Sequence, residues 1–187
     1  MCIAEARWLA AAGIAALLAA CAATAPQPRL VNGPMLGRPV DAAAIAAADV
    51  SVFPDGRGLP PGAGGVSEGL AVYERACRRC HGSQGVGGSG GHLVGRGPLT
   101  GPSADRTIGS YWPYATTLFD YVRRAMPPEA PWSLRNDEAY AVTAYLLQLN
   151  GIVPQDAVLD AGSLARIRMP NQGGFVGIDA PFQGPRR

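Results

Sequence analysis

Lysine is absent from this sequence: all sixteen basic residues are arginine, fourteen residues are acidic, and the formal net charge is only +2. So weak a positive charge gives no reason to expect a nucleic-acid partner. Histidine and cysteine are scarce, with two and four copies among 187 residues, and no internal repeat is apparent. The chain therefore has room for one modest domain, and its 25 glycines and 17 prolines predict much loop and turn.

Two of the four cysteines and one of the two histidines form a single motif, Cys77-Arg-Arg-Cys-His81. The spacing Cys-x-x-Cys-His is the attachment signature of a c-type haem, because two thiols on one helical turn reach both vinyl groups of a porphyrin and the next histidine faces its iron. The motif therefore predicts one haem c, bound through Cys77 and Cys80, with His81 on the iron. A porphyrin would also fill the thin core of a small, loop-rich domain.

Two other interpretations of the motif are open. A zinc half-site would need further ligands, yet outside the motif only His92, Cys2 and Cys21 are of the right type for soft ligation. A dithiol redox pair would need a βαβ surround, which the sequence does not show. Haem is the stronger prediction because the amino terminus indicates export.

The amino terminus resembles a secretion signal. Arg7 precedes an Ala- and Leu-rich run from Trp8 to Ala20, which is too short to span a bilayer comfortably. The run ends in Leu18-Ala-Ala-Cys21, which resembles the lipoprotein box in which the cysteine becomes the lipidated first residue. An ordinary cleaved signal is the alternative, but it leaves the Cys21 thiol without a use. We therefore predict a protein on the periplasmic side, held at the membrane by a lipid anchor.

Composition divides the rest of the chain. The stretch before Val40 is rich in Ala, Pro and Gly and predicts a flexible tether, and Asp41 is placed to cap a short helix up to about Asp49. An extended course then packs on the haem domain, and Val158 to Phe175 forms an extended strap. The predicted order is a lipoprotein signal peptide, a tether, the extended segment, the haem domain, and the strap with a disordered tail, at residues 1–20, 21–43, 44–66, 67–151 and 152–187.

Three segments with helical periodicity predict an all-α domain with long loops. The first begins at an N-cap at Ser67 and leads into the haem motif, with Leu70 and Tyr73 on its apolar face. The third is capped by Asn136 and ends at Asn150-Gly151 in a left-handed turn. Its apolar stripe is wide and indicates contacts on several sides: Tyr140, Val142, Ala144, Tyr145, Leu146, Leu147 and Leu149.

The second helical segment follows Pro113 and must stop at Met126, because a residue before proline is pushed away from helical dihedrals. Met126 is then free to turn its thioether inward, and it is the preferred distal iron ligand. Met169, His92 or an open iron site are the alternatives. A His/Met pair raises the haem potential and closes both axial positions, which favours electron transfer over catalysis at the iron. The apolar face of this helix consists of Leu118, Tyr121, Val122 and Ala125.

These elements resemble a class I cytochrome c domain. Ile108–Pro127 and Asp137–Gly151 are similar in particular to the cytochrome subunits of periplasmic sulfane and sulfite dehydrogenases, and the likeness covers about residues 44–175. The resemblance implies that Cys77 and Cys80 carry the thioethers and that His81 and Met126 are the axial ligands. It implies an electron-transfer protein of the sulfur-oxidation type, not an enzyme by itself, with a molybdenum dehydrogenase subunit and a downstream cytochrome as redox partners.

The resemblance makes two finer predictions. Gly69 and Tyr73 on the first helix should cross Val142 and Tyr145 on the last. Gly91-His-Leu-Val-Gly95 stands where such domains often have Pro-x-Leu-x-Gly, whose proline carbonyl orients the proximal histidine. The Gly91 carbonyl can still accept a hydrogen bond from His81, but from a more mobile loop.

The surroundings of the haem allow further candidates. Tyr111, Trp112 and Tyr114 would wall the pocket with Gly91 and Leu93 and bind the propionates, and plain core packing is the alternative. Four arginines would gather at the haem edge and steer an acidic partner, or else lie on solvated helix faces: Arg78, Arg79, Arg123 and Arg124. The competing functions are a free-standing carrier to a terminal oxidase, a haem enzyme or gas sensor with an open distal site, and a structural lipoprotein without haem.

Overall fold

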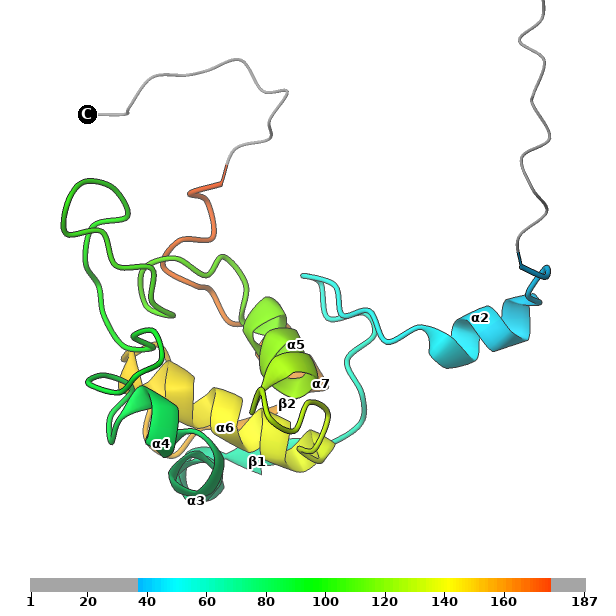
Figure 1. Ribbon diagram of the computed structural model, residues 1–187, viewed down its shortest axis with the longest axis horizontal. Coiled ribbons are helices and arrows are strands. Elements are labelled where there is room, and N and C mark those ends of the chain that lie inside the picture. The colour runs from blue at the N-terminus through cyan, green and yellow to red at the C-terminus, as the bar shows by residue number, and fades with distance from the viewer. Residues whose placement is uncertain (1–36, 176–187) are drawn as a thin grey trace, which may run out of the picture. The chain divides into compact units, whose positions relative to one another are not determined.

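The computed structural model describes residues 37–175 (Figure 1). The predicted signal peptide, the lipidation site at Cys21 and the tail after Asp179 lie outside the described residues. The chain divides into two units, residues 1–47 and 48–187. No helix between residues 37 and 175 is long and apolar enough to cross a membrane.

Helix α2, Ala42–Ala48, accounts for most of what is described of the first unit. Asp41 caps it as predicted, since its Oδ1 accepts a hydrogen bond of 2.8 Å from the backbone N–H of Ala44. All of its residues are exposed. Residues 44–48 are therefore helical and not extended, in agreement with the short helix predicted up to about Asp49.

The second unit is built around helix α6, Asn136–Leu149, which packs against α3, Val66–Ala76, and against α5, Ala115–Ala125 (Figure 1). A four-residue helix, α4 (Arg78–His81), follows α3 after a single residue. The helices carry most of the regular structure of this unit, in agreement with the predicted class of fold.

Helix α6 begins and ends through local hydrogen bonds. At its start the Glu138 carboxylate accepts from the backbone N–H of Arg135 at 3.0 Å, so the prediction that Asn136 is the cap is wrong. The Asn136 side chain instead donates to the carbonyl of Pro61 at 3.1 Å. At its end Gly151 has a φ of 64°, and its N–H donates to Gln148 O while the next N–H donates to Leu147 O. These two hydrogen bonds together form the Schellman motif, which confirms the predicted left-handed turn.

Helix α3 differs from its prediction in two ways. It begins at Val66 after extended Gly65, and the Ser67 hydroxyl bonds to the Glu68 carboxylate instead of capping the helix. Leu70 is 43% exposed, while Val72 on the same helix is buried. The helix is rotated so that its glycine, and not its leucine, faces the neighbouring helix.

The crossing of α3 and α6 depends on Gly69. A Cβ at this position would overlap the carbonyl oxygen of Ala141, so only glycine lets the two backbones come this close. One turn further along α3, the Tyr73 ring lies 5.2 Å from the ring of Tyr145. The predicted contact of Gly69 and Tyr73 with this part of the last helix is confirmed.

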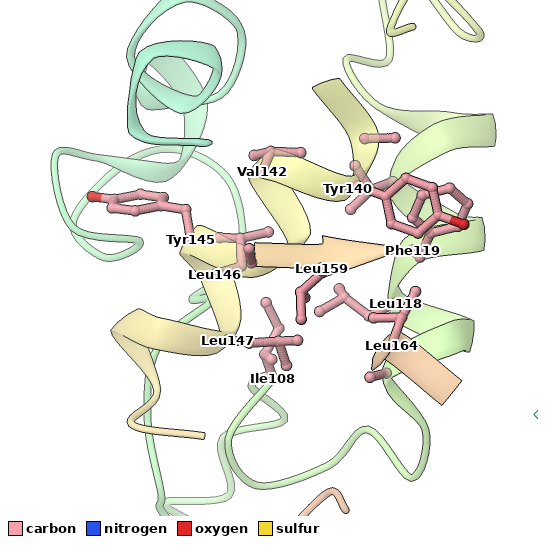
Figure 2. Packing of buried hydrophobic residues seen from close by; sticks show 14 of the residues in the cluster. Ile108, Leu118, Phe119, Tyr140, Val142, Tyr145, Leu146, Leu147, Leu159 and Leu164 are labelled. Atoms are coloured by element: carbon pink, nitrogen blue, oxygen red, sulfur yellow. The ribbon is translucent and has the colours of Figure 1, made fainter. Parts of the chain in front are cut away.

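The core extends from α6 toward both α3 and α5, and Figure 2 shows the residues that it shares with α5. Phe119 of α5 and Tyr140 of α6 are both fully buried, with ring centroids 4.4 Å apart. Leu118, Leu147 and Leu164 gather beside them, and Ile108 from the preceding loop completes this cluster. The core therefore joins helices to loops that are distant in sequence.

The segment after α6 is more regular than predicted. Strand β2, Val158–Asp160, pairs antiparallel with β1, Ala63–Gly65, in the register Ala63↔Asp160. A short helix, α7 (Ala161–Ala165), follows directly. The domain is thus mostly helical with a minor two-stranded sheet, and the predicted extended strap contains a strand and a helix.

Candidate haem-binding site

A cavity of about 490 Å³ opens beside α4 and the end of α5. This volume is in the range of sites that hold drug-sized or cofactor-sized molecules. The cavity is lined by the three motif residues that would bind haem: Cys77, Cys80 and His81. Apolar side chains from four other segments form much of the remaining wall: Leu93, Ile108, Trp112, Leu118, Val122, Val142 and Leu146.

The motif residues face the cavity because α4 is one tight helical turn. The backbone N–H groups of Cys80 and His81 both donate to the carbonyl of Cys77, at 3.1 and 3.0 Å. The two thiols carry no disulfide. Burial raises the pKa of the Cys77 thiol to about 11, although nearby Arg75 opposes this shift. A buried thiol with a high pKa is a weak nucleophile, which disfavours a dithiol redox pair.

His81 is oriented by a backbone carbonyl. Its Nδ1 lies 2.9 Å from the carbonyl oxygen of Gly91. A carbonyl only accepts hydrogen bonds, so Nδ1 carries the proton and Nε2 is left with a free lone pair for a metal. The expected hydrogen bond between His81 and the Gly91 carbonyl is therefore present, although glycine stands where similar domains often have proline.

The neighbouring glycine makes room for this imidazole. A Cβ at Gly90 would lie 2.9 Å from His81 Cε1, and its backbone N–H donates to Cys80 O at 2.6 Å. The loop thus wraps the histidine at backbone distance. Among residues 37–175, no cluster of three or more His, Cys, Asp or Glu side chains is arranged to hold a metal ion, as a zinc site would require.

Met126 is placed as predicted for a ligand. It follows the last residue of α5 with extended backbone, at φ −118° and ψ 139°, and it lines the cavity. Met169, its rival, is 4% exposed and belongs to the hydrophobic core cluster instead of the cavity wall. His92 lines the cavity too, but its Nδ1 is engaged with the Asp105 carboxylate at 3.0 Å.

Only one of the three predicted aromatic residues lines the cavity. Trp112 does so, with the Tyr121 ring edge-on to it at 5.5 Å. Tyr111 and Tyr114 are not among the residues that line this cavity, and their contact with a haem stays a prediction. Tyr111 packs on Phe175, with ring centroids 5.4 Å apart, and Tyr114 pairs with the strand-like backbone at Arg168.

One polar residue of the cavity wall, Arg106, was not predicted from the sequence. Arg106 lines the cavity, and its guanidinium also lies 5.6 Å from the centre of the Tyr111 ring. A guanidinium binds carboxylates in two-pronged fashion, which suits the propionate groups of a haem. A single arginine in a loop has no local pattern, so only the chain's path around the cavity identifies it.

The arginines predicted to steer a partner are each engaged within the domain. Arg78 pairs with Glu74 at 2.6 Å and Arg79 with Glu129 at 2.7 Å. Two others lie on or beside α5: Arg124 pairs with Asp120, and Arg123 stacks over the Trp132 ring. These contacts favour the alternative interpretation, in which the four arginines lie on solvated helix faces.

The residues present fit haem c. Two thiols lie one helical turn apart at an apolar cavity, and one histidine has its Nε2 free. A methionine thioether comes from a separate element, and a glycine leaves the space that the imidazole occupies. Cys77 and Cys80 would hold the group covalently, and His81 and Met126 would supply its axial ligands.

Comparison with known proteins agrees with this site. A family model described as cytochrome C oxidase, cbb3-type, subunit III matches residues 64–146. The crystal structure of the sulfane dehydrogenase SoxCD from Paracoccus pantotrophus contains a similar chain, at 42% identity and a TM-score of 0.70. That match covers 79% of this chain and 73% of the other. No curated protein matches the sequence.

Proposed function

Because this chain belongs to the c-type cytochromes and is similar to the cytochrome subunit of sulfane dehydrogenase SoxCD, we propose that it accepts single electrons from a sulfur-compound dehydrogenase. The observation that carries the proposal is the shared cavity of Cys77, Cys80, His81 and Met126. When bound, haem c supplies a one-electron iron couple.

The chain's own residues set the properties of that couple. The Gly91 carbonyl holds the Nδ1 proton of His81 and fixes the ring orientation. The thioether of Met126 favours a higher potential than a second histidine would. Apolar residues such as Leu118 and Val142 exclude water from the cavity, which disfavours the more highly charged ferric state.

Electron transfer is favoured over catalysis at the iron. If His81 and Met126 both bound the iron of a haem held here, they would leave no position on it for a small substrate. The alternative of a haem enzyme or gas sensor with an open distal site needs Met126 to lie elsewhere, whereas it lines the cavity.

The sequence and the relative support proposals for the number of haems, the location of the protein and its redox partners. The chain has one Cys-x-x-Cys-His motif, which supports a single haem. The lipoprotein box at Cys21 supports a lipid anchor on the periplasmic side of the membrane. We expect the donor to be the molybdenum subunit of a sulfane or sulfite dehydrogenase and the acceptor to be a downstream cytochrome.

The distal ligand provides the test. Met126→Ala should remove the weak near-infrared sulfur-to-iron band of the oxidised protein. It should also lower the reduction potential by on the order of 0.1 V, since axial ligands shift haem potentials over about 0.8 V in total. Met169→Leu is the matched control, because this methionine is buried in the core, and it should keep the band. A Met126→Ala protein with the wild-type spectrum and potential would rule out this ligand set.

A further inference from the structure

The Gly91 carbonyl is held by a loop with little rigidity of its own. Six of the ten residues from Gly82 to Gly91 are glycine. A Cβ at Gly91 would meet nothing within 4 Å, so no packing fixes this residue from its side-chain direction. Glycine has more backbone freedom than any other residue, yet the carbonyl must stay 2.9 Å from His81 Nδ1. The restraint has to come from elsewhere.

The restraint lies two residues downstream. Leu93 donates its N–H to Gly85 O at 2.7 Å, and its carbonyl accepts from the N–H of Ile108 at 3.2 Å. Gly95 accepts from the buried Thr107 hydroxyl at 2.6 Å. The segment from Leu93 to Gly95 is therefore fixed at both ends, and only His92 separates it from Gly91.

Asn150 holds both ends of this segment at once. Its Nδ2 donates to Leu93 O at 3.1 Å, and its Oδ1 accepts from the N–H of Gly95 at 3.3 Å. The same Nδ2 donates to Leu146 O at 2.8 Å, which ties the amide to the end of α6. Asn150 is 4% exposed, so these bonds are shielded from water.

The space around this amide is closed. A Cβ at Gly109 would lie 2.6 Å from Asn150 Oδ1, and Arg96 donates its guanidinium N–H to the Asn150 carbonyl at 2.5 Å. The side chain therefore has one position, set by α6. A rigid helix end of this kind is able to fix a flexible loop.

We propose that Asn150 is a positioning residue for the proximal histidine: through Leu93 and Gly95 it holds the Gly91 carbonyl against His81 Nδ1. The inference deepens the proposed function, because it rests on His81 as an iron ligand. A hydrogen bond at Nδ1 makes the imidazole a stronger donor and stabilises ferric iron. Loosening the loop therefore weakens that bond and raises the reduction potential.

Two neutral substitutions cut this network at different points. Asn150→Ala removes the amide, and Thr107→Val removes the hydroxyl that holds Gly95; neither changes a charge near the iron. Leu159→Ala is the matched control, since Leu159 is buried in β2 and does not line the cavity. The holoprotein is measured in each case, by solvent exchange of the His81 Nδ1 proton in the reduced state and by the reduction potential.

We expect both network variants to exchange this proton at least about tenfold faster than wild type, in line with the effects of losing a partner of a metal ligand. Their iron equilibrium should shift at least about threefold toward the ferrous state, which is about 30 mV for a one-electron couple. The control should lose stability but keep both wild-type values.

The proposal would be overturned if folded Asn150→Ala and Thr107→Val kept the wild-type exchange rate of the His81 Nδ1 proton and the wild-type reduction potential. It would also be overturned if Leu159→Ala changed both values equally. If Asn150→Ala does not fold, Thr107→Val decides alone. Failure of the proposed function is distinguishable, because the wild-type protein would then lack a low-spin His/Met spectrum before any substitution is made.

Discussion

The segments that carry the two axial ligands are held in different ways. The His81 segment, comprising α4 and residues 82–97, is joined to the domain by short or buried bonds, such as the Thr107 hydroxyl to Gly95 O at 2.6 Å. The Met126 segment, residues 126–134, is anchored at its far end by the buried Leu134, and nearer the methionine it is joined by surface contacts. Its Glu129 pairs with Arg79, and these side chains are 52% and 79% exposed. This difference indicates that the His81 segment is held rigidly, whereas the Met126 segment moves away from the cavity more readily.

Gly90→Ala tests the rigid side and should have the largest effect. The added Cβ would lie 2.9 Å from His81 Cε1 and 3.0 Å from Cys80 O, where a backbone carbonyl cannot give way. Overpacking of this kind costs about 1–3 kcal/mol. Denaturant unfolding of the holoprotein measures it. Gly91→Ala is the control, because its Cβ enters open space, and equal losses in the two variants would contradict the rigid packing around His81.

Tyr73→Phe should have an intermediate effect. The Tyr73 hydroxyl donates to Gly82 O at 2.8 Å, directly after α4, and losing a buried bond costs about 1 kcal/mol. Burial raises the pKa of Tyr73 from 10.0 to about 12. A folded-state pKa above the unfolded one means that this contribution is intact below pH 10 and is lost as pH rises toward 12.

The free energies of unfolding of wild type and Tyr73→Phe should therefore converge between pH 10 and 12. Tyr145→Phe is the control for the hydrogen bond, since this ring packs against Tyr73 and burial also raises its pKa, but its hydroxyl has no hydrogen bond in the described part of the chain, so its loss should cost less below pH 10. A difference that stays constant across this pH range would count against the buried Tyr73 hydroxyl as its source.

Glu129→Gln tests the methionine side and should have the smallest effect on stability. The pair with Arg79 is exposed, so its loss costs less than about 1 kcal/mol. It joins α4 to the Met126 segment, however, so imidazole should displace the methionine up to about fivefold faster. The increase should vanish at high salt, because exposed pairs are screened. Glu74→Gln, which breaks the Arg78 pair within the α3–α4 side, should leave the rate unchanged.

The sequence was sufficient where chemistry is local. The Cys77–His81 spacing and the proline after Met126 each act within a few residues, and both place their side chains at the cavity. Helix α6 was also predictable, since its glycine C-cap and wide apolar stripe are properties of one segment. Only its start differed, because Glu138, not Asn136, satisfies the first free N–H.

Features that depend on how distant segments meet were missed. Strand β1 is Ala-Gly-Gly, which has no strand pattern, and it forms only because β2 lies beside it. Tyr111 faces Phe175 because the chain after α6 returns to cover it. Arg106 has no local motif, and Asn150 has one only as a helix end, so the contacts of Arg106 with the cavity and of Asn150 with residues 93–95 depend on where distant loops lie.

The central claim is a haem joined to the chain through Cys77 and Cys80. The most direct measurement is extraction of the purified mature protein with acidified acetone, followed by the intact mass of the polypeptide. We predict that the colour stays with the protein and that the mass exceeds that of the polypeptide by one haem. Haem in the organic phase, or a mass equal to the bare polypeptide, would contradict the account.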